Sequence, residues 1–533
     1  MKPYLSLSYF FVICFGLTCL TSCQTKRPAI PKDLAKQQVI PKLVSVIPTG
    51  SSYEINNNTS IQYQSEKLQP VADYLAKMLR PVTGFELPVK MKDSKPSSNY
   101  IYLTLTDSIS TDEGYKLETK ESGVEIKASK PVGVFYGVQT LRQLLPASIE
   151  TGAKITDTLL VATGVIKDNP TYGYRGAMLD VSRHFFGVED VKRYIDLLSI
   201  YKMNRLHLHL TDDQGWRIEI KSWPKLTEIG GSTSIDSTKG GFYTQEQYKD
   251  IVKYAQKRFI TIVPEIDLPG HTNAALASYP ELNCDGVAPK LYHGTKVGFS
   301  SLCIDKEITY KFIDDVIGEL AAITPGEYIH IGGDESHATS PEDYVYFIDK
   351  AQEIVNKHGK KVIGWDEVAH AKLLPNTIVQ FWSRKGENAV EGVEKGAKIL
   401  MSPAPKLYFD MKYDSITRVG QNWAGYIKVE DAYSWDLETY QEGIAKENIL
   451  GIEAPLWTEY VQTMDDIEHL VFPRIMGVAE MGWTPASQRN WDEYKVRLGN
   501  HKDRLDALDI DYYASTFVPW RSKTNQETSN TKE

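Results

Sequence analysis

The chain has 533 residues, which is too many for one ordinary domain, so we expect two domains or a large barrel with an accessory domain. A hydrophobic content of 42% and a charged content of 24% are typical of a globular protein and exclude a disordered or fibrous one. The formal net charge of −9 argues against nucleic acid as a partner, because a polyanion needs clustered Lys and Arg.

The N-terminus has the pattern of an export signal. Lys2 precedes an apolar run from Tyr4 to Leu20, which is shorter than the roughly 20 apolar residues of a membrane-spanning helix. The order Leu20-Thr21-Ser22-Cys23 resembles a bacterial lipobox, which implies that residues 1–22 are a cleaved signal peptide and that Cys23 carries lipid. An ordinary signal peptide cut nearby is the alternative. We therefore expect an exported bacterial lipoprotein, anchored to a membrane surface and facing the periplasm or the cell surface.

The segment 23–42 is polar and rich in Pro and Lys, and we expect it to tether the lipid to the folded part of the chain. Cys14 and Cys19 leave with the signal peptide, so Cys284 and Cys303 are the thiols that remain without lipid. An even pair in an exported chain predicts a disulfide between them, with two reduced, buried thiols as the alternative.

Residues 43–167 predict a small α+β domain. One helix is expected over about Glu66–Leu79, ending at Pro81, and another over Val132–Leu145, ending at Pro146. We expect both helices to pack on a small antiparallel sheet. The strand-like runs, the last two of which flank a hairpin turn, are Tyr100–Leu105, Tyr115–Thr119 and Val124–Ala128.

Residues 170–485 predict a (β/α)8 TIM barrel, because short apolar runs alternate there with amphipathic helices such as Val188–Ile200, Gln245–Lys257 and Ile308–Ala321. An open doubly wound sheet is the runner-up, but no Gly-rich dinucleotide or phosphate loop supports it. The eight strand candidates are Ala177–Val181, Arg205–Leu210, Ile260–Ile266, Tyr328–Ile331, Lys361–Gly364, Ile378–Trp382, Lys398–Met401 and Ile449–Ala454.

The C-terminal part continues the barrel. A helix over about Trp491–Leu505 predicts that residues 486–521 form a helical extension. The tail 522–533 is polar and is expected to be disordered.

Nearly every predicted strand ends in an acid or an aromatic ring. In a barrel, functional side chains lie where strands end and βα loops begin, so these ends are expected to surround one pocket. Rings with a polar group also suit the apolar CH faces and hydroxyls of sugars, and the chain has 10 Trp and 31 Tyr. The strand-end residues are Asp180, Arg183, Asp212, Asp213, Glu265, Asp267, His271, Asp334, Glu335, Trp365, Asp366, Glu367, Trp382, Tyr408, Asp410, Trp457 and Glu459.

The fourth strand opens through Gly332-Gly333 into the adjacent carboxylates Asp334 and Glu335. Glycines allow a tight turn and a close approach to a ligand. Neighbouring carboxylates repel each other, so one tends to keep its proton at neutral pH, and a protonated acid beside an ionised partner suits glycosidic cleavage. A solvated acidic turn or a helix N-terminus is the alternative.

Five motifs in order resemble glycoside hydrolase family 20, the β-N-acetylhexosaminidase family. The resemblance covers roughly residues 43–485 and implies an α+β domain followed by the barrel. The motifs run from Tyr174 to Phe185, His207 to Arg217, Pro264 to His271, His330 to Glu335 and Leu456 to Glu459.

The resemblance implies an exo-acting, retaining hydrolysis that releases terminal GlcNAc or GalNAc from glycans or chitooligosaccharides. The substrate itself supplies the nucleophile and forms an oxazolinium intermediate. Glu335 is implied to protonate the glycosidic oxygen and later to deprotonate water. Asp334 is implied to orient the 2-acetamido group and stabilise its positive charge, and Tyr408 to hydrogen-bond the acetamido oxygen as it attacks.

The resemblance also implies a set of substrate-binding residues and neither a cofactor nor a metal. Trp216 and Trp423 are expected in packing or loop roles, since no motif ties them to the sugar. The implied roles are pocket walls from Trp365, Trp382 and Trp457, contacts to ring hydroxyls from Arg175, Asp410 and Glu459, and a lining position for His271.

Two other classes of protein stay open. His207 and His209 at a strand end could belong to a metal-dependent barrel hydrolase, although alternation also places structural His on one face. The second class is a glycan-binding lipoprotein without turnover, although the carboxylates of Asp334 and Glu335 are both present. The GlcNAc or GalNAc preference is undecided, and a homodimer is left open because barrels of this size often pair.

Overall fold

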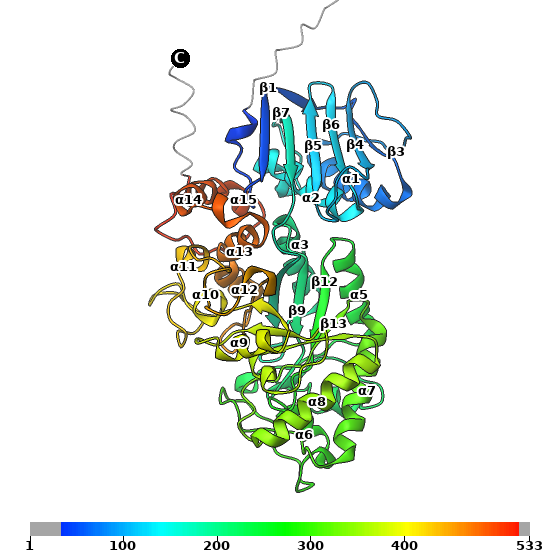
Figure 1. The fold of residues 1–533 in the computed structure, drawn as a ribbon. Coiled ribbons are helices and arrows are strands. Elements are labelled where there is room, and N and C mark those ends of the chain that lie inside the picture. Colours follow the sequence, from blue (N-terminus) through cyan, green and yellow to red (C-terminus); the bar gives the residue numbers. More distant parts are fainter. Residues whose placement is uncertain (1–32, 522–533) are drawn as a thin grey trace, which may run out of the picture.

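The structure, a computed structural model, describes residues 33–521, so the predicted signal peptide, the lipidation site Cys23 and the tail 522–533 lie outside the described residues. A sheet domain comes first in the chain and a closed barrel follows it (Figure 1). Within residues 33–521, no helix combines the length and the apolar character needed to cross a bilayer.

The sheet domain has seven strands in the spatial order β1-β7-β5-β6-β4-β2-β3, with α1 and α2 packed on it and on each other. The predicted hairpin is present, with Tyr115 opposite Ala128. The expected antiparallel sheet is wrong, because β2 pairs in parallel with both β3 and β4, and β4 with β6. The elements are β1 (Ser45–Ile55), β2 (Ser60–Tyr63), α1 (Gln69–Thr83), β3 (Val89–Met91), β4 (Tyr100–Leu105), β5 (Tyr115–Lys120), β6 (Gly123–Ala128), α2 (Pro131–Leu144) and β7 (Leu159–Asp168).

Two local predictions in this region are also wrong. Helix α1 passes through Pro81 and ends at Thr83, where the left-handed backbone of Gly84 (φ 70°) caps it. Pro81 is exposed in the last turn, where the loss of one hydrogen bond is tolerated. Residues 33–42 are not a free tether. Ile40 is fully buried and its backbone N–H donates to Oε1 of Gln143 in α2, so this segment is part of the folded domain.

The second domain is the predicted TIM barrel, closed by eight parallel strands that follow one another around the barrel in chain order. The strands are almost completely buried, as expected when helices cover a parallel sheet from outside. They are β8 (Tyr174–Asp180), β9 (Arg205–His209), β12 (Thr261–Glu265), β13 (Tyr328–His330), β14 (Lys361–Trp365), β15 (Ile378–Phe381), β16 (Lys398–Met401) and β17 (Ile449–Ala454).

Helices and one small ribbon complete the barrel. The longer helices are α3 (Val188–Ile200), α5 (Gln245–Gln256), α7 (Glu307–Ile323), α8 (Pro341–Lys357), α9 (Glu387–Glu394), α12 (Met464–Val471) and α13 (Arg474–Trp483). The shorter elements are β10 (Thr211–Asp212), β11 (Gly215–Trp216), α4 (Lys225–Glu228), α6 (Asn273–Ser278), α10 (Ala404–Leu407) and α11 (Val429–Tyr433).

The C-terminal helices join the two domains (orange to red in Figure 1). The single helix predicted over 491–505 is two, α14 (Trp491–Asn500) and α15 (Lys502–Ala507), interrupted at His501. The ring of His501 contacts the Gln38 carbonyl at 2.6 Å, so the interruption coincides with a contact to the N-terminal segment.

Candidate active site

The turn after β13 places Asp334 and Glu335 at the C-terminal end of the barrel. Gly332 has a φ of 67°, and a Cβ there would lie 1.7 Å from Oδ1 of Asp267, so a side chain does not fit. Glu335 has a φ of 48°, a conformation that costs a non-glycine residue about 1–3 kcal/mol and that clusters at functional sites. The surrounding fold therefore holds a strained turn that presents two adjacent carboxylates.

His271 lies beside both carboxylates. Its Nε2 is 3.7 Å from Oδ2 of Asp334 and 3.6 Å from Oε2 of Glu335, and its Nδ1 is 3.2 Å from Oδ1 of Asp212. Burial alone would lower the pKa of His271, but Asp212, Asp267 and Asp334 together raise that pKa well above its ordinary value. The ring of His271 therefore favours the imidazolium form. It lies between the carboxylate of Asp212 on one side and those of Asp334 and Glu335 on the other.

Burial raises the pKa of Asp334 to about 6, with His271 opposing the shift and Glu335 adding to it. Burial and Asp334 also raise the pKa of Asp267 well above its ordinary value. The sequence argument expected repulsion within the adjacent pair to keep one proton near neutral pH. In the structure the raised group is Asp334, and burial is the larger cause.

An aromatic surface stands beside the carboxylates. Trp457 lies 6.1 Å from Tyr408 and 5.7 Å from Trp365, measured between ring centroids. Tyr408 stacks on Trp382 at 6.2 Å with an interplanar angle of 18°. Trp365 is fully buried behind Trp457, where its Nε1 donates to Glu265 at 2.8 Å. The predicted residues Trp365, Trp382 and Trp457 thus come together, and Trp365 packs behind Trp457.

Polar atoms without a protein partner converge at this surface. Both carboxylate oxygens of Asp410, Oε2 of Glu459, Oδ1 of Asp334 and Nε2 of His271 are buried and make no hydrogen bond. Such groups are costly unless a ligand or water satisfies them. Burial and Glu459 raise the pKa of Asp410 well above its ordinary value, so Asp410 can also donate a hydrogen bond. This set suits a ligand rich in hydroxyl and amide groups.

The expectation that Arg175 contacts the substrate is wrong. Arg175 opens strand β8, fully buried at the junction of the two domains, where its guanidinium donates two 3.0 Å hydrogen bonds to Glu113. Arg183 follows the C-terminal end of the same strand. It pairs with Asp212 at 2.8 Å and lies 4.8 Å from the ring centroid of Trp457. The arginine of the pocket is therefore Arg183.

Trp423 is a site residue that the sequence argument missed. It is 44% exposed, and its ring lies 5.8 Å from Tyr408 and 6.4 Å from Trp382, at nearly right angles to both. It stands in a loop between α10 and α11, outside every motif, so no sequence signal could have placed it at the rim. Trp216 packs on Phe312 in the core, as expected.

The His207 and His209 pair does not form an open metal site. Both side chains face the barrel interior, and several groups of three acidic and imidazole residues there are close enough to hold an ion. The ring nitrogens are nevertheless occupied. His207 lies between Glu453 and Glu265, and His209 between Glu265 and Asp212, so each nitrogen already faces a carboxylate.

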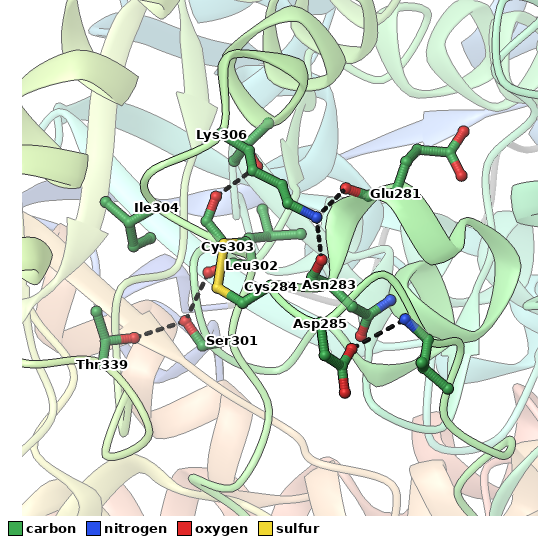
Figure 2. Close-up of a disulfide and its surroundings, with 12 residues drawn as sticks. Glu281, Asn283, Cys284, Asp285, Ser301, Leu302, Cys303, Ile304, Lys306 and Thr339 are labelled. Carbon is green, nitrogen blue, oxygen red and sulfur yellow. Dashed lines mark hydrogen bonds between the residues drawn. A yellow bond between two sulfur atoms is a disulfide. The ribbon is translucent and has the colours of Figure 1, made fainter.

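The predicted disulfide between Cys284 and Cys303 is present (Figure 2). It closes a loop that lies on the acid side of the site. A Cβ on Gly298 would lie 3.0 Å from the Glu335 carbonyl oxygen, and Ser300 donates a hydrogen bond of 2.5 Å to Asp213. The disulfide therefore fixes a loop that packs against the Asp334–Glu335 turn.

Comparisons with known proteins agree with this geometry. Residues 172–344 and 337–486 match the catalytic domain of glycosyl hydrolase family 20, and residues 36–169 match domain 2 of that family. The chain is 39% identical to a β-N-acetylhexosaminidase of Cellulomonas fimi (90% of this chain and 97% of that one) and 37% identical to a β-hexosaminidase of Porphyromonas gingivalis (95% and 68%).

A solved structure extends the comparison. The N-acetyl-β-hexosaminidase of Streptomyces plicatus, in complex with Thio-NAglucal, superposes with a TM-score of 0.89 at 51% identity and covers 93% of this chain and 99% of that one.

Proposed function

The chain belongs to glycosyl hydrolase family 20, and from this premise we propose that it releases terminal, non-reducing N-acetylhexosamine with the substrate's own acetamido oxygen as nucleophile. That it is a β-N-acetylhexosaminidase rests on the family and on relatives of that name at 37–51% identity. The finer proposal rests on one observation: several buried polar atoms that have no hydrogen-bond partner lie at the Asp334–Glu335 turn and beside it.

An exo mode of action is supported by the burial of the groups proposed to bind the non-reducing end. Asp410 is 1% exposed and Trp457 is 8% exposed. Asp410, Glu459 and Arg183 would contact the hydroxyls at the non-reducing end. The leaving group would then extend past Glu335, whose side chain is 29% exposed.

The chemistry follows from the positions of three groups. Glu335, on the open side, would donate its proton to the glycosidic oxygen and then take one from water. Asp334, deeper in the site, would hold the acetamido N–H and stabilise the positive charge that develops on the ring. Burial raises the pKa of Tyr408 well above its ordinary value, with Asp334 adding to the shift, so its hydroxyl remains a donor for the acetamido oxygen.

A panel of aryl glycosides tests this proposal. The enzyme should hydrolyse aryl N-acetylglucosaminide or N-acetylgalactosaminide, and a thiazoline mimic of the cyclic intermediate should inhibit it. Replacing the 2-acetamido group of the substrate by hydroxyl should abolish turnover, because the nucleophile is then missing. Equal hydrolysis of both substrates would refute the substrate-assisted mechanism.

We also propose that the enzyme is an exported lipoprotein anchored through Cys23, which lies outside the described residues. The order of residues before Cys23 supports this, and so does the Cys284–Cys303 disulfide, since such bonds persist in oxidising compartments. Labelling of the wild-type protein but not of C23S by a fatty-acid analogue, with membrane association lost in C23S, is the expected result. Equal labelling of both would refute the anchor.

A further inference from the structure

A continuous chain of carboxylates and imidazoles runs inside the barrel toward the catalytic turn. Oε1 of Glu453 lies 2.9 Å from Nδ1 of His207, and Nε2 of His207 lies 3.1 Å from Oε2 of Glu265. The same Glu265 oxygen contacts Nδ1 of His209, and Nε2 of His209 lies 2.7 Å from Oδ2 of Asp212. Asp212 then binds His271, the ring beside Asp334 and Glu335.

The members of this chain are all buried. His207, His209, Glu265 and Glu453 have no exposed surface, and Asp212 is 1% exposed. Further polar groups anchor the chain at Glu453 and at Asp212. Glu453 accepts hydrogen bonds from Tyr174 at 2.7 Å and Gln380 at 2.8 Å, and Asp212 pairs with Arg183.

The arrangement limits the protonation states that the rings can adopt. A neutral imidazole can donate from one nitrogen only, so a ring whose two nitrogens both face carboxylates must either carry two protons or face a protonated acid. Since His207, His209 and His271 each lie between acids, the chain is satisfied when all three are imidazolium ions and the acids between them are ionised. Positive and negative charges then alternate from Glu453 to the pocket.

We propose that Glu265 and His209 are positioning residues of the reaction: through Asp212 they hold His271 as a doubly protonated ring directed at Asp334 and Glu335. The inference rests on the proposed function. Neither residue touches the sugar. His209 also meets the edge of Trp457 at 4.8 Å, so its orientation supports the pocket wall as well.

The groups that face the two residues come from several strands. Glu265 meets His207 and His209 of β9, His330 of β13 at 3.0 Å and Trp365 of β14. His209 meets Asp212. Burial lowers the pKa of His209, but Glu265 and Asp212 raise it well above its ordinary value, and Glu265 is the larger contributor. The charge of His209 also acts on Asp267 and Asp334.

Glu265→Gln tests the proposal, because the amide has nearly the shape of the carboxylate but no charge. Without that charge His209 should lose its extra proton within the assay range. The alkaline limb of kcat/KM for an aryl N-acetylglucosaminide should therefore move to lower pH by about one unit or more. A Glu265→Gln profile parallel to that of the wild type, whatever its height, would overturn the proposal.

Asp168→Asn is the matched control. Asp168 is also a buried acid, paired with Lys202 at 3.1 Å and Tyr115 at 2.6 Å, but it lies at the junction of the two domains. This variant should lose thermal stability and keep the wild-type pH profile. A shift of the profile in Asp168→Asn as large as in Glu265→Gln would mean that any buried acid has this effect, which would also overturn the proposal.

A second measurement does not depend on activity. The ring 15N shifts of the wild-type enzyme, labelled at histidine and assigned by single His substitutions, should show both nitrogens of His207 and His209 protonated at pH 8. A neutral tautomer at His209 would overturn the proposal. If the wild type released no N-acetylhexosamine, the proposed function would fail, while these spectra would still decide the protonation of the chain.

Discussion

Arg175 lies near the start of strand β8 and Arg183 follows its end, eight residues later in the same motif, yet the two side chains have unrelated surroundings. Arg175 donates to both oxygens of Glu113 and to the carbonyls of Tyr172 and Lys202. Arg175→Met leaves Glu113 without its cation and those carbonyls without a donor. Breaking a buried ion pair costs about 3–5 kcal/mol, which corresponds to a fall in Tm on the order of 10 °C.

The activity of Arg175→Met should change little, because no Arg175 atom reaches the pocket. With folded protein at 25 °C, kcat/KM should stay within about threefold of the wild type. Adding Glu113→Gln should recover part of the lost stability, since the orphaned charge is removed. Arg183→Met should behave in the opposite sense, with a loss in kcat/KM of about 10²-fold or more from the lost ion pairs at the site.

Thermal unfolding and steady-state kinetics on the same preparations decide between the two arginines. An Arg175→Met protein with an unchanged Tm and a 100-fold loss in kcat/KM would refute the reasoning, because a contact between Arg175 and substrate would then be required.

Three further outcomes follow from the site. Glu335→Gln should lower kcat about 10²–10⁴-fold on substrates with poor leaving groups. The loss should be much smaller on nitrophenyl glycosides, because their leaving group needs little protonation. Equal losses across a leaving-group series would contradict the assignment of Glu335 as the acid. The pKa of Asp334 is raised to about 6, so its carboxylate is neutralised as the pH falls through that value. We therefore expect kcat/KM to decline below pH 6, and the residual activity of Asp334→Asn should lack this acidic limb of the pH profile. Gly332→Ala should yield little folded enzyme, because the added Cβ would collide with Asp267. Gly359 has a similar φ of 73° but open space around it, so Gly359→Ala should lower the free energy of unfolding by only about 1 kcal/mol in chemical denaturation. Equal costs at the two positions would refute the steric argument.

The barrel could be predicted from the sequence because each strand is a short apolar run and each helix has its own periodicity. The Asp334–Glu335 turn could also be predicted, because two glycines and two acids follow Ile331, the residue after β13. The N-terminal segment was not, because Ile40 is one of a few apolar residues in a polar stretch, and only the distant Gln143 amide satisfies its backbone. Composition averages over such residues.

Arg175 shows where a motif stops being informative. Motif membership does not state which end of a strand a side chain occupies, and a seven-residue strand separates the junction of the domains from the pocket. Trp423 shows the converse, because a rim residue in a long loop belongs to no pattern. Strand alternation predicted that His207 and His209 share a face, but their partner Glu265 is 56 residues beyond His209 and is brought to them by barrel closure.

The internal chain bears on how the enzyme can keep so many acids in one place. Asp212, Asp267, Asp334, Asp410 and Glu459 would repel one another strongly if all were ionised in a dry pocket. The imidazolium ions that alternate with the acids inside the barrel neutralise the charge of those acids. Raised pKa values allow acids at the site, among them Asp410, to hold protons until a ligand arrives. In the proposed mechanism, the charge on Asp334 would then act mainly on the positive charge that develops on the substrate, which is the condition for stabilising a transition state more than the bound sugar.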